Sequence, residues 1–230
     1  MRICFILLSW LIFITPLLAQ KDLTFGLQTG ATFSTFNTEI TISDGFSSTV
    51  PPINYFGLTG NFHLGAWLQK RFNSFVAIRL EIQRNPGGAK TFDALEERLK
   101  RYKYFSLNIP LIVQLTSFQQ KMRNPIHLEL GISPNFFLFD YGEDITFGTV
   151  NKLNYSTLIG LTKNVDDKWA VSLRYLRGLT PFSQFEAGGL LVDWIDQQYS
   201  LTFNRMLFAI QKKDNGKKKR KKKRKKKRRR

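Results

Sequence analysis

The sequence has few of the residues from which thiol and metal chemistry are built. Among 230 residues there is one cysteine, Cys4, and there are two histidines, His63 and His127. A single cysteine excludes a disulfide within the chain, and two scattered histidines do not form the ligand spacing of a metal site. We therefore predict no metal site and no cofactor.

Long apolar runs are equally scarce. The longest lies at the start of the chain, where Arg2 precedes an apolar segment, Pro16 interrupts it, and Ala19 comes before Gln20. This is the form of a secretory signal peptide, and the run is shorter than the ~20 residues of a membrane-spanning helix. The alternative is a membrane anchor. We predict a signal peptide over residues 1–19, removed after Ala19 together with Cys4, and no spanning helix after it.

Acidic residues are scarce relative to basic ones mainly in one region of the chain. The formal net charge of the chain is +18, and residues 211–230 hold 16 Lys or Arg and one Asp, a net charge of +15. The remaining 210 residues therefore carry only +3. A tail of this composition cannot bury apolar surface, so we predict that residues 211–230 are disordered and extended by charge repulsion.

Alternation of apolar and polar residues is what the sequence has in abundance. It is clearest over residues 104–116, YFSLNIPLIVQLT, where every second residue from Phe105 to Leu115 is apolar and the other row is mostly polar. A side-chain period of two indicates a strand with one face in an apolar environment. Seven further segments repeat the pattern: residues 22–34, 56–70, 74–84, 125–137, 152–163, 168–178 and 198–210.

The connections between these segments are alternately long and short. Antiparallel neighbours joined in this way have all long loops at one end, as outer-membrane barrels do. We predict an all-β fold over residues 20–210, an eight-stranded antiparallel up-and-down transmembrane β-barrel. Three local features are also expected: a short helix from the helical spacing of Phe92, Leu95 and Leu99, a bulge or register change at 204–206, and strand extension over 190–195. For the last stretch, a docking surface is the alternative.

The direction in which the apolar rows point separates two kinds of barrel. In a soluble barrel of lipocalin type the apolar row faces inward, whereas in a membrane barrel it faces lipid. The polar row of residues 22–34 is small and uncharged, which suits a narrow interior and favours the membrane barrel. Aromatic residues at strand ends are expected to form the two rims of the membrane band, and Tyr102, Tyr104, Phe136, Phe139, Trp169, Tyr199 and Phe208 are among them.

Two stretches resemble a known family. Residues 25–34, FGLQTGATFS, resemble the opening strand of the PorT-like outer-membrane β-barrel proteins of Bacteroidota, and residues 104–113, YFSLNIPLIV, are similar to that family's central strand. The resemblance extends from about residue 20 to 210 and implies an eight-stranded outer-membrane barrel. Some relatives are linked to type IX secretion and gliding. The chain departs from the usual pattern because Phe208 is followed by a basic tail.

Ionisable residues on the predicted inward rows are the candidate site of the barrel. They are expected to form a charge network that fills a narrow lumen, because buried charges must be paired. The alternative is an envelope-lipid hydrolase with a histidine as base, a glutamate that orients it and a hydroxyl nucleophile. No serine lies in a recognisable nucleophile motif, so we predict a non-enzymatic structural or accessory protein. The network residues are His63, Arg79, Glu81, His127, Glu129 and Arg174.

The basic tail is the second candidate interaction site. An even number of strands places both termini on the periplasmic side, where the tail would contact anionic lipid, peptidoglycan carboxylates or an acidic protein. A secretion signal argues against nucleic acid as the ligand. Other expected partners are outer-membrane lipid and an envelope or secretion complex, and a tail without function is the alternative. The residues expected to contact an anionic surface are Lys217, Lys218, Lys219, Arg220, Arg224, Arg228, Arg229 and Arg230.

Overall fold

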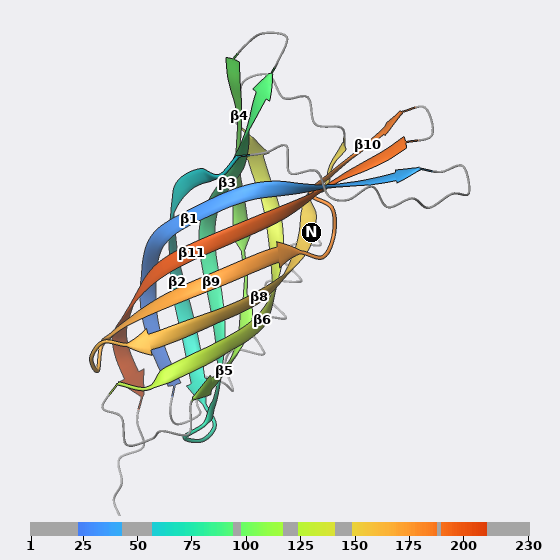
Figure 1. The fold of residues 1–230 in the computed structure, drawn as a ribbon. Coiled ribbons are helices and arrows are strands. Elements are labelled where there is room, and N and C mark those ends of the chain that lie inside the picture. Colours follow the sequence, from blue (N-terminus) through green and yellow to red (C-terminus); the bar gives the residue numbers. More distant parts are fainter. Residues whose placement is uncertain are drawn as a thin grey trace, which may run out of the picture. The chain divides into compact units, whose positions relative to one another are not determined.

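The strands of the protein form a closed sheet (Figure 1). The computed structural model describes residues 23–42, 57–93, 98–116, 124–140, 149–187 and 190–210. The barrel is one compact unit, Thr24–Phe208; a second unit, Met1–Leu23 with Ala209–Arg230, lies almost wholly outside the described residues. The strands are β1 Leu23–Ile42, β2 Thr59–Arg71, β3 Val76–Asp93, β4 Arg98–Asn108, β5 Leu111–Thr116, β6 Ile126–Asp140, β7 Thr149–Val150, β8 Leu153–Asn164, β9 Trp169–Gly178, β10 Ser183–Ala187 and β11 Leu190–Ile210.

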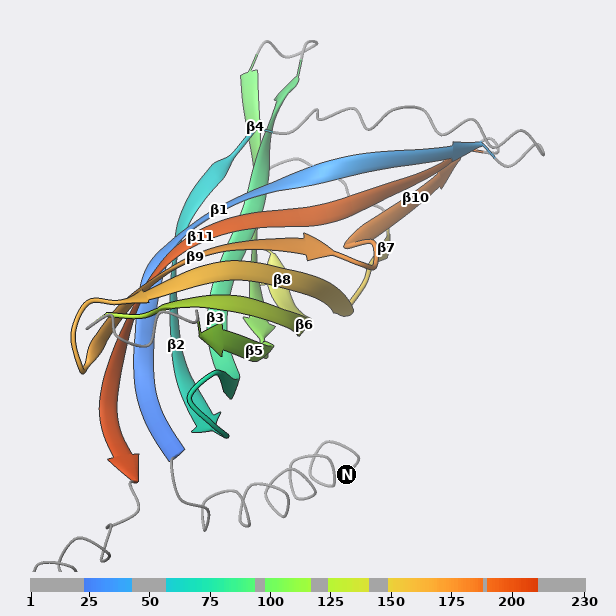
Figure 2. The same cartoon turned by 60° about the horizontal axis from the view of Figure 1, so that its bottom comes forward.

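Among the described residues, the sheet closes as a ring of eight strand positions. The order is β1-β2-β3-β4-β6-β8-β9-β11, and β11 pairs with β1 to close the ring. β5 continues the position of β4 between β3 and β6. Figures 1 and 2 show these strands side by side around one lumen. The predicted fold class is confirmed, with two additional short strands: β10 pairs with β11, and β7 pairs with β10.

The predicted strand over residues 104–116 is divided into β4 and β5. Pro110 has no backbone N–H to donate to a ladder, so the strand is interrupted there. Its carbonyl still accepts a hydrogen bond from the Glu81 amide at 2.9 Å, and the Ile109 amide donates to the Pro134 carbonyl at 3.0 Å. These bonds hold the interrupted strand in its place between β3 and β6.

The ladder between β9 and β11 bears on the bulge or register change that the sequence predicts at 204–206. β11 pairs with β9 in unbroken register down to Arg205↔Trp169, and the Met206 amide donates to the Lys168 carbonyl at 2.8 Å. On the side of β11 that pairs with β9, the expected bulge or register change at 204–206 is therefore not found. The described register shift between β4 and β6 lies at Phe105/Ser106.

Two hairpins extend the barrel at one end, which we call the long-loop end (Figure 1). β3 and β4 pair out to Asp93↔Arg98, with Phe92 opposite Leu99, so the predicted helix is wrong. The two residues are brought together across a strand ladder, which satisfies their backbone groups as well as a helix would. β10 and β11 pair out to Ala187↔Leu190, which confirms strand extension over 190–195. The short-turn end is formed by residues 72–75 and 165–168.

The apolar rows face outward. Along β8 the residues alternate strictly between exposed and buried. Leu111 is 46% exposed, whereas Gln28, Arg79 and Glu129 are buried. This arrangement excludes the lipocalin-type barrel, because an apolar exterior around a polar interior suits lipid. Within the described ranges, no helix is long and apolar enough to cross a membrane.

The aromatic rims are only partly as predicted. The side chains of Phe136, Phe139, Trp169, Tyr199 and Phe208 are exposed, but Tyr199 lies in the middle of β11 and not at a strand end. Tyr102 and Tyr104, in contrast, are 2% exposed and lie inside, so their placement at the outer rim is wrong. Both belong to the inward row of β4 and therefore lie in the lumen.

Candidate functional site in the lumen

Four ionised side chains meet in the middle of the lumen and form what we call the ionic cluster: Arg79, Glu81, Glu129 and Arg174. They come from β3, β6 and β9, and none is more than 4% exposed. Each occupies an inward position of its strand, where the two-residue period places it. Two positive and two negative groups give the cluster a formal charge of zero.

Arg174 is the centre of the cluster. Its Nη1 and Nη2 donate to Glu81 Oε2 and Oε1 at 2.7 and 2.8 Å. Its Nε donates to Glu129 Oε2 at 2.6 Å. Such charge-assisted and bidentate contacts are the strongest hydrogen bonds that proteins make. One guanidinium therefore joins carboxylates from two separate strands.

Arg79 completes the charge balance from a greater distance. Its Nη1 lies 3.5 Å from Glu81 Oε1 and 3.6 Å from Glu129 Oε1. Its Nε and Nη2 donate to Gln69 Oε1 at 3.0 and 2.8 Å, and its Cζ lies 4.7 Å from the centroid of the Trp67 ring. The guanidinium is thus held by an amide and a ring face as well as by the carboxylates.

Glutamine amides donate further hydrogen bonds to both carboxylates. Glu81 Oε2 accepts from Gln28 Nε2 at 3.1 Å and from Gln83 Nε2, and Glu129 Oε1 accepts from Gln114 Nε2 at 2.6 Å. Sequence reasoning did not assign these glutamines to the site. Their signal was available, because each lies on the inward row of its strand, but neutral amides are less conspicuous than charges.

Gly160 on β8 provides the space in which Arg174 lies. It is paired with Glu129 on one side and with Arg174 on the other. A Cβ at this position would lie 2.8 Å from Arg174 Cγ and 2.8 Å from the Leu173 carbonyl oxygen. A larger residue would therefore push the guanidinium from its two carboxylates, so the glycine serves packing of the cluster.

The two histidines lie in the lumen but make separate contacts. His63 Nδ1 is 2.9 Å from Thr32 Oγ1 and its Nε2 is 3.1 Å from Thr202 Oγ1. His127 Nδ1 is 3.0 Å from Thr116 Oγ1. Among the described contacts, none joins either imidazole to a carboxylate. Within the described ranges, the base–carboxylate pair on which the hydrolase hypothesis depends is therefore not found.

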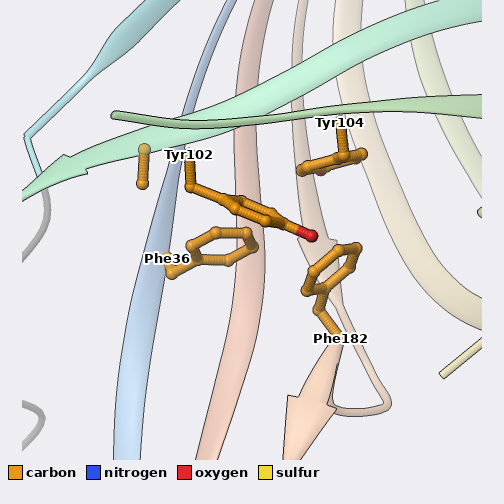
Figure 3. Packing of buried hydrophobic residues seen from close by; sticks show 5 residues of the cluster. Phe36, Tyr102, Tyr104 and Phe182 are labelled. Atoms are coloured by element: carbon orange, nitrogen blue, oxygen red, sulfur yellow. The ribbon is translucent and has the colours of Figure 1, made fainter. Parts of the chain in front are cut away.

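A cluster of buried aromatic side chains, drawn close up in Figure 3, lies nearer the long-loop end, where β4 leads into the β3–β4 hairpin. It consists of Phe36, Ala89, Tyr102, Tyr104 and Phe182, all buried. The ring centroids of Tyr104 and Phe182 are 4.7 Å apart, and those of Phe36 and Phe182 are 5.1 Å apart. Tyr104 Oη donates to Asp196 Oδ2 at 2.7 Å. Sequence analysis missed this cluster because its tyrosines were assigned to the rim.

Two predicted features have no structural account. The tail residues from Lys217 to Arg230 and the predicted signal peptide lie outside the described residues, so both stay predictions. Among the residues that the structure describes, no group of three or more Cys, His, Asp or Glu side chains is placed to hold a metal ion.

The chain is similar to known outer-membrane proteins. A family model described as "Outer membrane protein beta-barrel domain" matches residues 18–184. The chain is similar to OprG of Pseudomonas aeruginosa, with 12% identity and a TM-score of 0.49, covering 83% of this chain and 98% of that one. It is also similar to AlkL solved in lipid bilayers, with 16% identity and a TM-score of 0.43, covering 82% and 94% of the two chains. None of the curated proteins compared matches it.

Proposed function

Because the chain belongs to the outer membrane protein β-barrel domain family, we propose that it is a closed, non-enzymatic barrel with a structural or accessory role in the cell envelope. The observation that carries the proposal is the ionic cluster, in which Arg174 binds both Glu81 and Glu129 across the lumen. A barrel of about eight strands has room for side chains and little else.

The ionic cluster favours a closed lumen for an energetic reason. An ion that passes the lumen would have to displace charges that already satisfy one another at 2.6–2.8 Å. Removing one partner from a buried pair costs several kcal/mol, on the order of 3–5. The aromatic cluster adds an apolar layer that offers no polar groups to a passing ion beyond the tyrosine hydroxyls. Two layers of different chemistry thus support a closed lumen.

The proposed setting follows from the family and from the strand pattern. We place the short-turn end and both termini in the periplasm, with the long-loop end outside the cell. The resemblance of residues 25–34 and 104–113 to PorT-like proteins makes an envelope or secretion complex the partner that we propose first. In that setting the barrel serves as a membrane anchor for other components.

Ion conductance of the purified barrel in planar lipid bilayers tests the proposal. We expect no steady current from the wild type. The variant R79A/E129A removes one charge of each sign and leaves the Arg174–Glu81 pair in place, so it should fold and leak ions. The matched control is R177A/E39A, which removes an exposed pair 3.6 Å apart and should stay closed. A steady open-channel current from the wild type overturns the proposal.

A further inference from the structure

An arginine interrupts the apolar outer face of the barrel on β3. The outward row of this strand is apolar from Val76 to Ile82, and Arg84 follows as its first charged residue. Arg84 is directly opposite Leu64 on β2 and Leu107 on β4, and Leu64 is 60% exposed. Residues directly opposite each other in a ladder share one face of the sheet. The exposed Arg84 side chain is therefore on the lipid-facing side of the wall.

The position of Arg84 along β3 puts it near the edge of the apolar band at the long-loop end. It lies eight residues after Val76, with which β3 begins. At ~3.3 Å per residue and a strand tilt of ~40°, its Cα is roughly 20 Å above the short-turn end of the strand, and the apolar band of such barrels is about 25 Å tall. A long side chain at this level extends its charged end to the lipid headgroups.

An aromatic ring holds the guanidinium of Arg84 against the outer surface. Arg84 Cζ lies 4.3 Å from the centroid of the Phe105 ring, and the Phe105 and Phe139 centroids are 4.9 Å apart. A ring face attracts the positive charge and leaves most of the five N–H donors available. Among the residues that the structure describes, no carboxylate lies within ion-pair distance of Arg84 and no acceptor receives its hydrogen bonds.

Arg177 is the counterpart of Arg84 on the opposite side of the barrel. It lies eight residues after Trp169, with which β9 begins, and β9 is four positions from β3 in the ring. Its side chain is also exposed, but its Nη2 lies 3.6 Å from Glu39 Oε1. The described part of the chain thus supplies an anion for Arg177 and none for Arg84. The anion for Arg84 comes from the surroundings of the barrel.

We propose that Arg84 binds the phosphate group of an anionic lipid in the leaflet at the long-loop end, with an acyl chain lying along Ile82, Leu64 and Leu107. The forked guanidinium matches two phosphate oxygens. A lipid is favoured over dissolved phosphate, because the apolar residues beside the arginine can pack against a chain that the free ion lacks. Lipid binding at this site does not depend on a closed lumen, so it is tested apart from the proposed function.

Titration of the folded, full-length barrel with phosphatidylglycerol tests the site. The chain is held in maltoside micelles, which contain no phosphate, at neutral pH and constant ionic strength. The backbone amides of residues 84 and 177 are followed by NMR, so basic residues elsewhere report through their own signals. We expect saturable shifts at residue 84 and much smaller ones at residue 177. Equal responses at the two residues would overturn the proposal.

Two further ligands separate the phosphate from the chain that carries it. Diacylglycerol has the same acyl chains without the phosphate, and inorganic phosphate has no chains. Neither should give a saturable shift at residue 84. A response to either one as strong as the response to phosphatidylglycerol contradicts the assignment of a lipid phosphate.

Two variants each remove one positive charge at the same level of the barrel. Arg84→Gln should weaken phosphatidylglycerol binding at residue 84 roughly tenfold or more, because a charge-assisted hydrogen bond is lost. Arg177→Gln is the matched control and should leave that binding unchanged, since Arg177 already faces Glu39. If Arg84→Gln does not fold, Arg84→Lys keeps the charge without the fork and should weaken binding by a smaller factor. Unchanged affinity in whichever Arg84 variant folds, or an equal loss in Arg177→Gln, rules the site out.

Discussion

The ionic cluster and the aromatic cluster fill two lengths of one lumen by different means. In the ionic cluster, every group depends on partners from other strands, and Arg174 alone binds two carboxylates. In the aromatic cluster, rings pack at centroid distances of 4.7–6.1 Å and have few polar groups that need hydrogen-bond partners. Loss of one charge leaves another buried and unpaired, whereas loss of one ring leaves a cavity. We therefore expect a substitution in the ionic cluster to lower the free energy of unfolding more than a substitution in the aromatic cluster.

The largest effect is expected from Arg174→Met. This variant leaves Glu81 and Glu129 buried with only Arg79 nearby, at 3.5 and 3.6 Å. We expect the free energy of unfolding to fall by about 3–5 kcal/mol, as when one partner of a buried pair is removed. Urea-dependent unfolding of the barrel in lipid vesicles measures the change.

A charge-balanced double variant serves as the control for this prediction. Adding Glu81→Leu to Arg174→Met leaves Glu129 with Arg79, so the double variant should be more stable than the sum of the two single losses predicts. Strict additivity of the single losses would mean that the charges do not act as one cluster.

A smaller effect is expected from Phe182→Ala in the aromatic cluster. The Phe182 ring packs against Phe36 and Tyr104, and its side chain is 3% exposed. We expect a loss of about 2 kcal/mol in the same unfolding experiment, below the usual cost of a buried phenylalanine because water can refill the lumen. Phe72→Ala, at a turn residue 58% exposed, is the control. A loss as large as that of Arg174→Met would remove the contrast between the two clusters.

The smallest effect is expected outside the lumen. Arg177 Nη2 lies 3.6 Å from Glu39 Oε1, with both side chains about half exposed. Exposed pairs contribute roughly 0–1 kcal/mol, because water screens the charges and the side chains lose freedom on pairing. Arg177→Ala should therefore leave the unfolding curve nearly unchanged. A loss comparable to that of Arg174→Met would show that burial is not what makes the ionic cluster strong.

Particular residues show which features of the fold could be predicted from the sequence and which could not. The alternation along residues 104–116 predicts an outward Leu111 and an inward Gln114, and both lie as expected. The same alternation places Tyr104 on the inward row, yet the tendency of tyrosine to sit at membrane rims led to the wrong assignment. Phe92 and Leu99 have helical spacing but are cross-strand neighbours, because three apolar residues are too few to outweigh a continuing ladder.

The sequence by itself determined which side of each strand faces lipid, because a period of two leaves no other choice once one row is apolar. It also determined which ionisable groups are available to the interior. Only the tertiary structure decided which of them meet, since Glu81 and Arg174 are 93 residues apart in the chain. Ring closure and the register of β6, β8 and β9 bring Glu129, Gly160 and Arg174 into one row, and no local pattern encodes that alignment.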